Sequence, residues 1–167
     1  MKQLLTTFVI FSISFLFVAC NDKTATTTNE ETKSTFDLAA AKKTIDSLNV
    51  EFGTLVSKTD TVGLASMYTA DAKMLPPNMP AASGKKDIQT TFSGLFAATG
   101  PIGLTLTSND VWGTEALVSE EGSYTMTDKS GKQIDKGKYI VLWKMEDGKW
   151  KIFRDIFNSD NPPPPAK

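Results

Sequence analysis

Histidine is absent from this chain, and cysteine occurs only once, as Cys20. Without histidine the protein cannot form a Ser-His-Asp or Cys-His nucleophile system or an imidazole zinc site. A single cysteine also excludes a disulfide within the monomer. Any acid–base chemistry would therefore depend on aspartate, glutamate, tyrosine or lysine, which need burial or close neighbours to reach a useful pKa.

The chain also lacks a strong excess of charge of either sign. Its formal net charge is −1 at pH 7, and its lysines and arginines form no basic run. Such a sequence predicts no positively charged surface that could bind the phosphates of nucleic acid. It contains neither a phosphate-binding glycine loop nor the spacing of a calcium-binding loop. We therefore expect no nucleic-acid partner, no metal site and no cofactor.

A hydrophobic N-terminal run at residues 4–19 follows Lys2 and ends just before Cys20. A positive residue, an apolar stretch and a small residue before a cleavage point are typical of a secretory signal peptide. The four residues from Phe17 to Cys20 resemble the lipobox of bacterial lipoproteins, in which the cysteine receives a diacylglyceryl group. The resemblance implies a signal peptide at 1–19 and lipidation of Cys20. The protein is then expected to be extracytoplasmic, lipid-anchored to a bacterial membrane.

The same run could instead be a transmembrane anchor, because it is about long enough to span a bilayer. Polar residues directly after Cys20 favour cleavage. Residues 20–35 are rich in Thr, Asn, Glu and Lys and cannot bury a core, which predicts a flexible tether. Residues 162–167 include four consecutive prolines and predict an extended tail. The folded domain is expected at 36–161.

Helices are predicted in the first part of this domain. Apolar residues over 38–55 recur at alternating spacings of three and four, which indicates a long amphipathic helix. A capping box at Ser34–Asp37 would start it. Asp60 would cap a short second helix that carries Val62 and Tyr68 on its buried side.

A third helix is expected to begin at Ser83-Gly84 and to stop at Gly100-Pro101. After it the apolar period changes to two, which indicates strands. These strands lie at 102–106, 115–127, 133–145 and 149–158, and a brief strand at 73–75 precedes the third helix. Helices followed by an antiparallel meander predict an α+β fold, with the helices packed on one face of a curved sheet.

The last two predicted strands can be paired through a tight turn at Asp147-Gly148. This register places Ile140 opposite Asp155. One face of the ribbon would then carry Lys138, Ile140, Leu142, Phe153, Asp155 and Phe157. Both faces are substantially apolar, although a sheet covered only on one side should have a polar outer face. We therefore expect a second subunit on that face and a homodimer. A one-residue bulge would reassign the two faces.

The order of these elements and several short motifs resemble the nuclear-transport-factor-2-like (NTF2-like) superfamily. Within it, the chain looks most like the SnoaL-like and ketosteroid-isomerase-like branch, and a domain of unknown function carried by bacterial lipoproteins. The motifs are Met67-Tyr68, Pro76-Pro77-Asn78 and residues 83–88, 147–152 and 154–159. The resemblance implies a cone-shaped fold, in which a curved sheet wraps around helices and encloses a pocket, and a dimer.

The resemblance does not bring isomerase activity with it. Ketosteroid isomerase uses a general-base aspartate, an oxyanion-hole tyrosine and a protonated aspartic acid. The corresponding positions here are Pro76, Phe52 and Ile140, and none of these can donate or accept a proton. We therefore expect no steroid isomerase activity.

Asp155 corresponds to the acid–base carboxylate of the SnoaL-like polyketide cyclases. Apolar neighbours would raise its pKa by desolvation and make it a candidate catalytic base. An aspartate near a strand end can also serve only as a structural hydrogen-bond acceptor. The candidate ligand-binding residues are Tyr68, Trp112, Tyr124 and Asn158, although Trp112 and Tyr124 could instead fill the core or an interface.

Three functions remain open from the sequence. The leading hypothesis is a lipid-anchored domain that binds a small apolar ligand in a cone pocket. The second is a proton-transfer enzyme, a cyclase, isomerase or dehydratase, built on Asp155. The third is a structural dimeric module whose interior is filled by its own phenylalanines.

Overall fold

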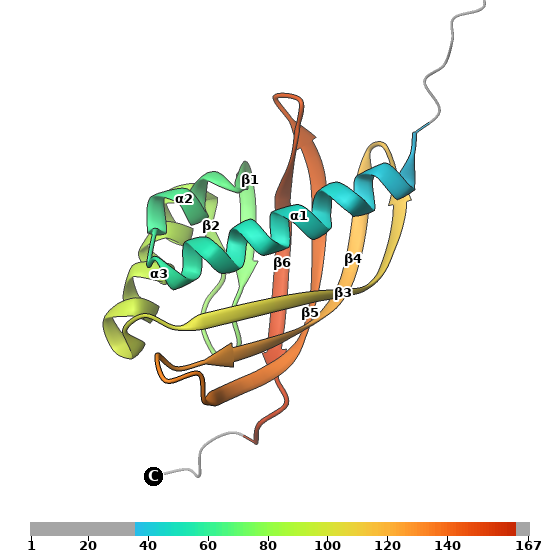
Figure 1. Ribbon diagram of the computed structural model, residues 1–167. Helices are drawn as coiled ribbons and strands as arrows, with labels where there is room; N and C mark the ends of the chain where they lie inside the picture. The colour runs from blue at the N-terminus through green and yellow to red at the C-terminus, as the bar shows by residue number, and fades with distance from the viewer. Residues whose placement is uncertain (1–35, 163–167) are drawn as a thin grey trace, which may run out of the picture. The chain divides into compact units, whose positions relative to one another are not determined.

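The computed structural model describes residues 36–162. They form the predicted α+β fold, with helices packed on a curved six-stranded sheet (Figure 1). The predicted signal peptide, the lipidation site Cys20, the tether at 20–35 and the tail beyond residue 162 lie outside the described residues. Between residues 36 and 162, no helix is long and apolar enough to cross a membrane.

The helices are α1 (Leu38–Ser57), α2 (Thr61–Ser66) and α3 (Gly84–Thr99). Asp37 alone is the N-cap of α1, in place of the predicted box that began at Ser34; its carboxylate accepts a backbone N–H at 3.0 Å. Asp60 caps α2 as predicted. Two predictions for α2 were wrong: Val62 faces outward, and the helix has only 6 residues, so Tyr68 lies beyond its end. Val62 is 66% exposed, and Tyr68 is the first residue of a strand.

The strands are β1 (Tyr68–Leu75), β2 (Ala82–Ser83), β3 (Gly103–Thr114), β4 (Leu117–Thr127), β5 (Gln133–Glu146) and β6 (Lys149–Ser159). Their order in the sheet is β2-β1-β6-β5-β4-β3. All neighbouring pairs are antiparallel except β1 and β6, which run parallel. The pairing with β6 extends β1 back to Tyr68, well before the predicted start at residue 73. A local sequence pattern does not predict a pairing between strands so far apart in the chain.

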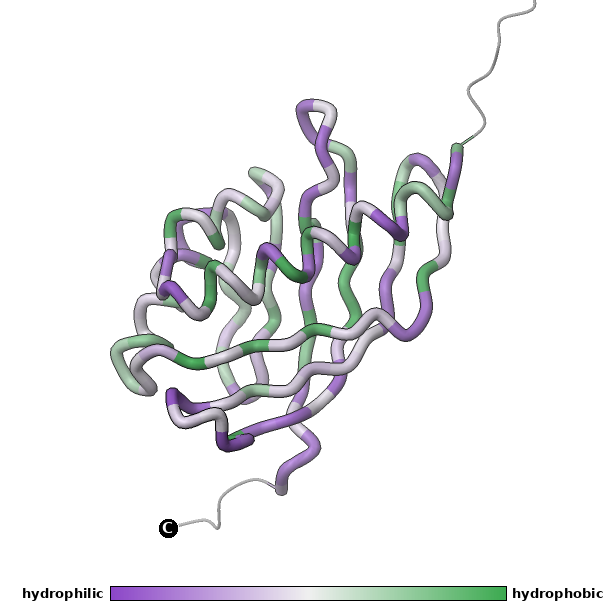
Figure 2. Tube along the Cα trace, viewed as in Figure 1, coloured by the Kyte–Doolittle hydropathy of each residue, from purple (hydrophilic) through white to green (hydrophobic). Residues whose placement is uncertain are grey.

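Helix α1 crosses the concave side of the sheet (Figure 1). Hydrophobic and hydrophilic positions alternate along it (Figure 2), as expected for a helix with one buried side. Its buried residues are Ala41, Ile45, Asn49, Phe52, Gly53 and Val56. The predicted stripe was therefore right in period but included Leu48 and Leu55, which are only partly buried. It also missed Asn49, a polar residue in the core.

A bulge in β6 changes the predicted faces of the last ribbon. The register agrees with the prediction from the turn as far as Trp143, after which Phe153 has no partner on β5. Asp155 therefore lies opposite Val141, and the predicted pairing with Ile140 was wrong. Because one extra residue reverses the side that later side chains face, Asp155 points to the helix-covered side of the sheet.

Candidate functional site

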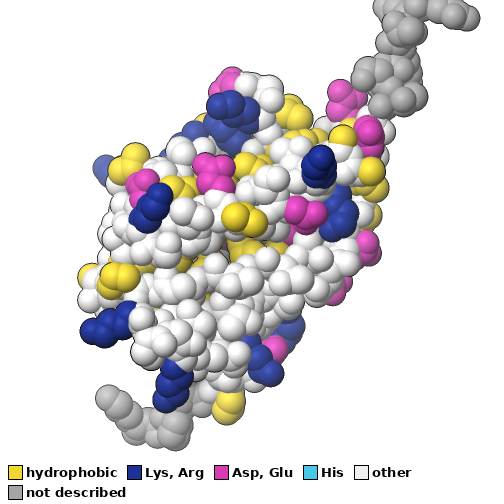
Figure 3. All heavy atoms as spheres, viewed as in Figure 1, with side chains coloured by type: hydrophobic (Ala, Val, Ile, Leu, Met, Phe, Trp, Pro, Cys, Tyr) yellow, Lys and Arg dark blue, Asp and Glu magenta, His cyan; other side chains and the backbone are white. Residues whose placement is uncertain are grey.

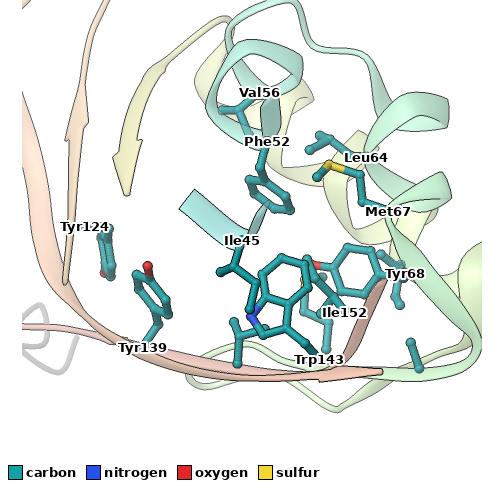
Figure 4. Close-up of a cluster of buried hydrophobic side chains, with 14 of the residues drawn as sticks. Ile45, Phe52, Val56, Leu64, Met67, Tyr68, Tyr124, Tyr139, Trp143 and Ile152 are labelled. Atoms are coloured by element: carbon teal, nitrogen blue, oxygen red, sulfur yellow. The ribbon is translucent and has the colours of Figure 1, made fainter. Parts of the chain in front are cut away.

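A cavity of about 80 Å³ lies between the helices and the sheet. Residues of α1, α3, β1 and strands β3 to β6 line it, and most of these side chains are apolar. The polar side chains in its wall are Asn49, Tyr124, Tyr139, Trp143 and Asp155. Figure 4 shows Phe52 of α1 above Trp143 of β5, with Tyr139 and Tyr124 on the neighbouring part of the sheet.

The surface of this side of the domain is mixed. In the space-filling view, apolar side chains come to the surface between α1 and the strands below it, while charged side chains lie along the outer side of α1 (Figure 3). Phe52, Phe92 and Phe157 line the cavity but do not fill it. A completely filled interior, which the structural-module hypothesis requires, is therefore not what is found.

Among the described residues, Asp155 is the only carboxyl group that lines the cavity. It is 8% exposed, and the hydroxyl of Tyr68 donates a hydrogen bond of 2.7 Å to its Oδ2. Burial raises the pKa of Asp155 from its ordinary value of 3.8 to about 6; the hydrogen bond from Tyr68 lowers this pKa, and the charge of Glu120 raises it. Asp155 can therefore exchange a proton near neutral pH.

Glu120 is a second buried carboxyl group, and sequence reasoning missed it. Its side chain is 0% exposed, and three donors from two elements surround it. Its Oε1 accepts hydrogen bonds from Asn49 Nδ2 at 2.6 Å and from the Tyr139 hydroxyl at 2.8 Å. Its Oε2 accepts one from Trp143 Nε1 at 2.9 Å. The only sequence signal is its position two residues after Val118 in an alternating strand, which places it on the buried face.

Glu120 and Asp155 lie in one row across the sheet. Val141 of β5 pairs with Glu120 on one side and with Asp155 on the other. Residues paired in this way have side chains on the same face, and neighbouring strands are about 5 Å apart. The two carboxyl groups therefore flank the small Val141 side chain, which explains why the charge of Glu120 raises the pKa of Asp155.

Two glycines allow the tyrosines of the cavity wall to lie against the sheet. A Cβ atom at Gly122 would overlap the ring of Tyr139, and one at Gly137 would overlap the ring of Tyr124. The Tyr124 hydroxyl donates to Asp135 Oδ2 at 3.0 Å. Burial raises the pKa of both phenols, and the carboxylates that they face raise it further. Both phenols therefore stay protonated and serve as donors to carboxylates.

Only some of the predicted ligand-binding residues lie at the cavity. Tyr124 lines the cavity. Tyr68 is fully buried and does not line it, but contacts Asp155, which does. Trp112 is 43% exposed and is not part of the wall. Asn158 is exposed and pairs with Lys138 on the outer side, because the bulge reverses the face of the strand end. Trp112 and Asn158 therefore do not belong to the wall of this cavity.

Of the three positions that correspond to the catalytic residues of ketosteroid isomerase, only one lies at the cavity. Phe52 lines the cavity, whereas Pro76 and Ile140 do not. Ile140 lies between the inward-facing Tyr139 and Val141 and therefore points to the outer face. Over residues 36–162 there is also no cluster of acidic or cysteine side chains that could hold a metal ion.

Solved structures with the same fold are numerous, and their sequence identity to this chain is low. A protein of unknown function with a cystatin-like fold from Nostoc punctiforme is 15% identical, covers 73% of this chain and 92% of its own, and superposes with a TM-score of 0.67. An NTF2-like protein from Novosphingobium aromaticivorans is also 15% identical, with 72% and 82% covered and a TM-score of 0.62. A ketosteroid isomerase-like protein from Erwinia carotovora is 20% identical, with 72% and 96% covered and a TM-score of 0.60. These similarities show the fold.

No curated protein matches the chain. The family model of SnoaL-like domains matches residues 50–153, from the middle of α1 through the bulge of β6. The matched segment contains Glu120 and most of the cavity wall, and it ends two residues before Asp155. The chain belongs to the family of SnoaL-like domains.

Proposed function

We propose that this protein binds a small, mainly apolar molecule in the cavity and that Asp155 is the polar group that orients it. The observation that carries this proposal is a wall of apolar and aromatic side chains with one buried carboxyl group in it. Concave, mostly apolar cavities with a few convergent polar groups are the usual form of small-molecule sites.

The size of the cavity restricts the ligand. A cavity of roughly 150 Å³ in another protein binds benzene, and the cavity here is about 80 Å³. A steroid or polyketide nucleus does not fit into this space. The ligand is therefore a molecule of a few non-hydrogen atoms, or the side chains of the wall move apart to admit a larger one.

Methyl NMR titration with isobutanol tests this proposal. Ile102 and Ile152 line the cavity, whereas Ile134 and Ile156 are exposed and serve as internal references. We expect saturable shifts of the first pair only. Val141→Phe should fill the cavity and abolish the shifts. Shifts of equal size in all four methyl groups would contradict a site in the cavity.

The matched control for the filling variant is Ile134→Phe. Ile134 is on the same strand as Val141, but it is 44% exposed. This control enlarges a side chain at the surface and should leave isobutanol binding unchanged. Loss of binding in both variants would mean that a general disturbance of the sheet, and not occupation of the cavity, removes the ligand.

A proton-transfer enzyme is the second candidate, favoured by the pKa of about 6 for Asp155. A general base with a pKa close to the working pH is efficient. Native mass spectrometry of the domain from its own host would identify a retained molecule to be tried as substrate. Asp155→Asn should then abolish its conversion and leave its binding intact. Conversion by this variant at the unaltered rate would exclude Asp155 as the base.

The lipid anchor and the extracytoplasmic location are part of the proposal and are supported by the apolar run that ends at Cys20. The full chain should be labelled by radioactive fatty acid and should partition into a detergent phase. Cys20→Ser should prevent both. A purified protein that retains residues 1–19 would exclude processing as a lipoprotein.

We also propose a homodimer through the outer face of the β5–β6 ribbon. After the bulge this face carries Ile140, Leu142, Phe153 and Ile156, and Ile156 is 49% exposed. Native mass spectrometry should give twice the monomer mass, and Ile156→Glu should give monomers. A monomer at all concentrations would exclude this assembly.

A further inference from the structure

The side-chain hydrogen-bond donors in the cavity wall already donate to acceptors of the protein itself. Asn49, Tyr139 and Trp143 line the cavity, and each of them donates to the carboxylate of Glu120. The amide nitrogen of Asn49 also lies 3.5 Å from the Tyr139 hydroxyl oxygen, which is itself bonded to the same Glu120 oxygen, so these two acceptors share one side of the amide. Glu120 does not line the cavity, yet it engages most of the polar hydrogens in the wall.

The two remaining hydroxyl groups are used in the same way. Tyr68 donates to Asp155 Oδ2, and Tyr124 donates to Asp135. Apart from the second N–H group of Asn49, every side-chain donor in the described wall already has an acceptor in the protein. Acceptors are left, because Oδ1 of Asp155 accepts no hydrogen bond from the described residues and the Asn49 carbonyl oxygen does not either. With Asp155 ionised, the cavity therefore offers its ligand mainly acceptors.

The charged groups at the cavity are all acidic. Asp155 and Glu120 are buried, and no lysine or arginine belongs to the wall. The ion pairs among residues 36–162 join other groups, such as Lys138 with Asp160 and Lys151 with Glu146. Buried carboxylates are normally paired with a positive group because burying an unpaired charge is costly. The pair here lacks such a group within the described protein.

From this arrangement we infer that the cavity selects ligands that donate hydrogen bonds, and small primary ammonium ions above all, which bind at Oδ1 of Asp155. This inference rests on the proposed ligand-binding function and names the chemical class of the ligand. An ammonium group supplies both the donor and the positive charge that the site lacks. The rings of Phe52, Phe92 and Tyr124 add faces that attract a cation when it is desolvated.

The same arrangement disfavours ligands whose only polar group is a carbonyl. A carbonyl oxygen needs a donor, and an oxyanion formed from it needs one more strongly. The donors that could serve, on Asn49, Tyr139 and Trp143, are held by Glu120. A carbonyl compound would therefore have to compete with Glu120 for these donors and would bury its oxygen near Asp155.

The test compares three molecules with the same number of non-hydrogen atoms: isobutylamine, isobutanol and butanone. Their affinities for the unaltered domain are measured by methyl NMR titration at pH 8, where Asp155 is ionised because its pKa is about 6. We expect isobutylamine to bind about tenfold more tightly than isobutanol, because charge-assisted hydrogen bonds are roughly twice as strong as neutral ones. Butanone should bind most weakly.

Two variants connect the selectivity to the carboxyl groups. Asp155→Asn should remove the preference for isobutylamine over isobutanol and should improve butanone binding, because the amide can donate. Glu120→Gln should reduce the preference for the amine. Its matched control is Glu121→Gln, because Glu121 is the next residue on β4 and is exposed. This control should keep the full preference.

The outcomes separate the two proposals. If none of the three molecules binds to the cavity, the proposed ligand-binding function fails. If they bind with equal affinity, or if butanone binds most tightly, ligand binding stands and the selectivity for donors is wrong. An amine preference that persists in Asp155→Asn also overturns it. The first comparison uses the unaltered protein, so it does not depend on whether a variant folds.

Discussion

The two faces of the β5–β6 ribbon are built from the same two strands but have different chemistry. The inner face carries Tyr139, Val141, Trp143, Ile152 and Asp155, all of which are buried. The outer face carries apolar residues that are half-buried or exposed. There Lys144 and Arg154 lie over the ring of Phe153, with their charged groups 3.5 and 3.6 Å from its centre.

This difference shows that apolar composition alone does not identify the face of a strand that builds a site. Both faces are apolar in sequence, and the unpaired Phe153 decides which of them receives Asp155. Without the bulge, Asp155 would face outward beside exposed side chains. With it, the carboxyl group enters the interior and has a pKa of about 6.

Insertion of one alanine between Arg154 and Asp155 is the most severe way to break the contrast between the faces. The insertion adds a second extra residue to β6 and turns Asp155 and every later residue of the strand to the opposite side. The loss of stability should exceed about 4 kcal/mol, the upper range for local changes, as measured by urea denaturation. An insertion variant of normal stability that still binds isobutanol would show that the number of residues before Asp155 does not determine its face.

Replacing one large side chain on each face gives the next largest effect. Trp143 is 1% exposed, and Trp143→Ala should lower the free energy of unfolding by about 3–5 kcal/mol because it leaves a cavity. It also leaves Oε2 of Glu120 without its donor. Leu142→Ala, one residue away on the outer face, should cost about 1 kcal/mol in a monomer. A larger loss for Leu142→Ala that depends on protein concentration would indicate a subunit covering the outer face.

The pH dependence of stability reports the burial of Asp155. Because its pKa is raised from 3.8 to about 6 in the folded protein, the folded state binds this proton more tightly than the unfolded state. Its contribution to stability is therefore present below about pH 4 and is lost as the pH rises to about 6, by about 3 kcal/mol. Asp155→Asn should lack this loss. Urea denaturation of both proteins from pH 4 to pH 8 measures it.

Exposed Asp110 provides the matched control for the pH experiment. Asp110→Asn should keep the pH dependence of the parent protein, because this residue lies on the surface of β3. If Asp155→Asn and the parent have parallel stability curves from pH 4 to pH 8, the pKa of Asp155 is not raised and the carboxyl group is solvated.

The smallest effect is expected on the outer face. Lys144→Met keeps the length of the side chain but removes the charge over the Phe153 ring. The cost should be about 0.5–1 kcal/mol, as for other half-exposed cation–π contacts. Urea denaturation in low and high salt measures it. A cost as large as that of Trp143→Ala would mean that the outer face is as tightly packed as the inner one.

Much of the fold was predictable because its signals are local. The apolar period of α1, the cap at Asp60, the stop at Gly100 and the turn before Gly148 each depend on a few neighbouring residues. The candidate site was predictable only in part. Asp155 and Tyr124 were named for the pocket and line it, whereas Trp112 and Asn158 do not.

Glu120 illustrates why the rest of the site was not predictable. A glutamate in a strand of mixed polarity is normally exposed. Its burial depends on donors from Asn49 on α1 and from Tyr139 and Trp143 on β5, which lie far from it in sequence. No local sequence pattern predicts such a set of partners.

The amino-acid sequence by itself determined the α+β class, the helix and strand periods, and the exclusion of histidine- and cysteine-based chemistry, because these depend on composition and on near neighbours. The tertiary structure alone decided that Asp155 turns inward and that Glu120 engages the donors of the cavity wall. A bulge is chosen by the packing of both sheet faces, and a buried carboxylate is tolerated only where distant donors converge on it.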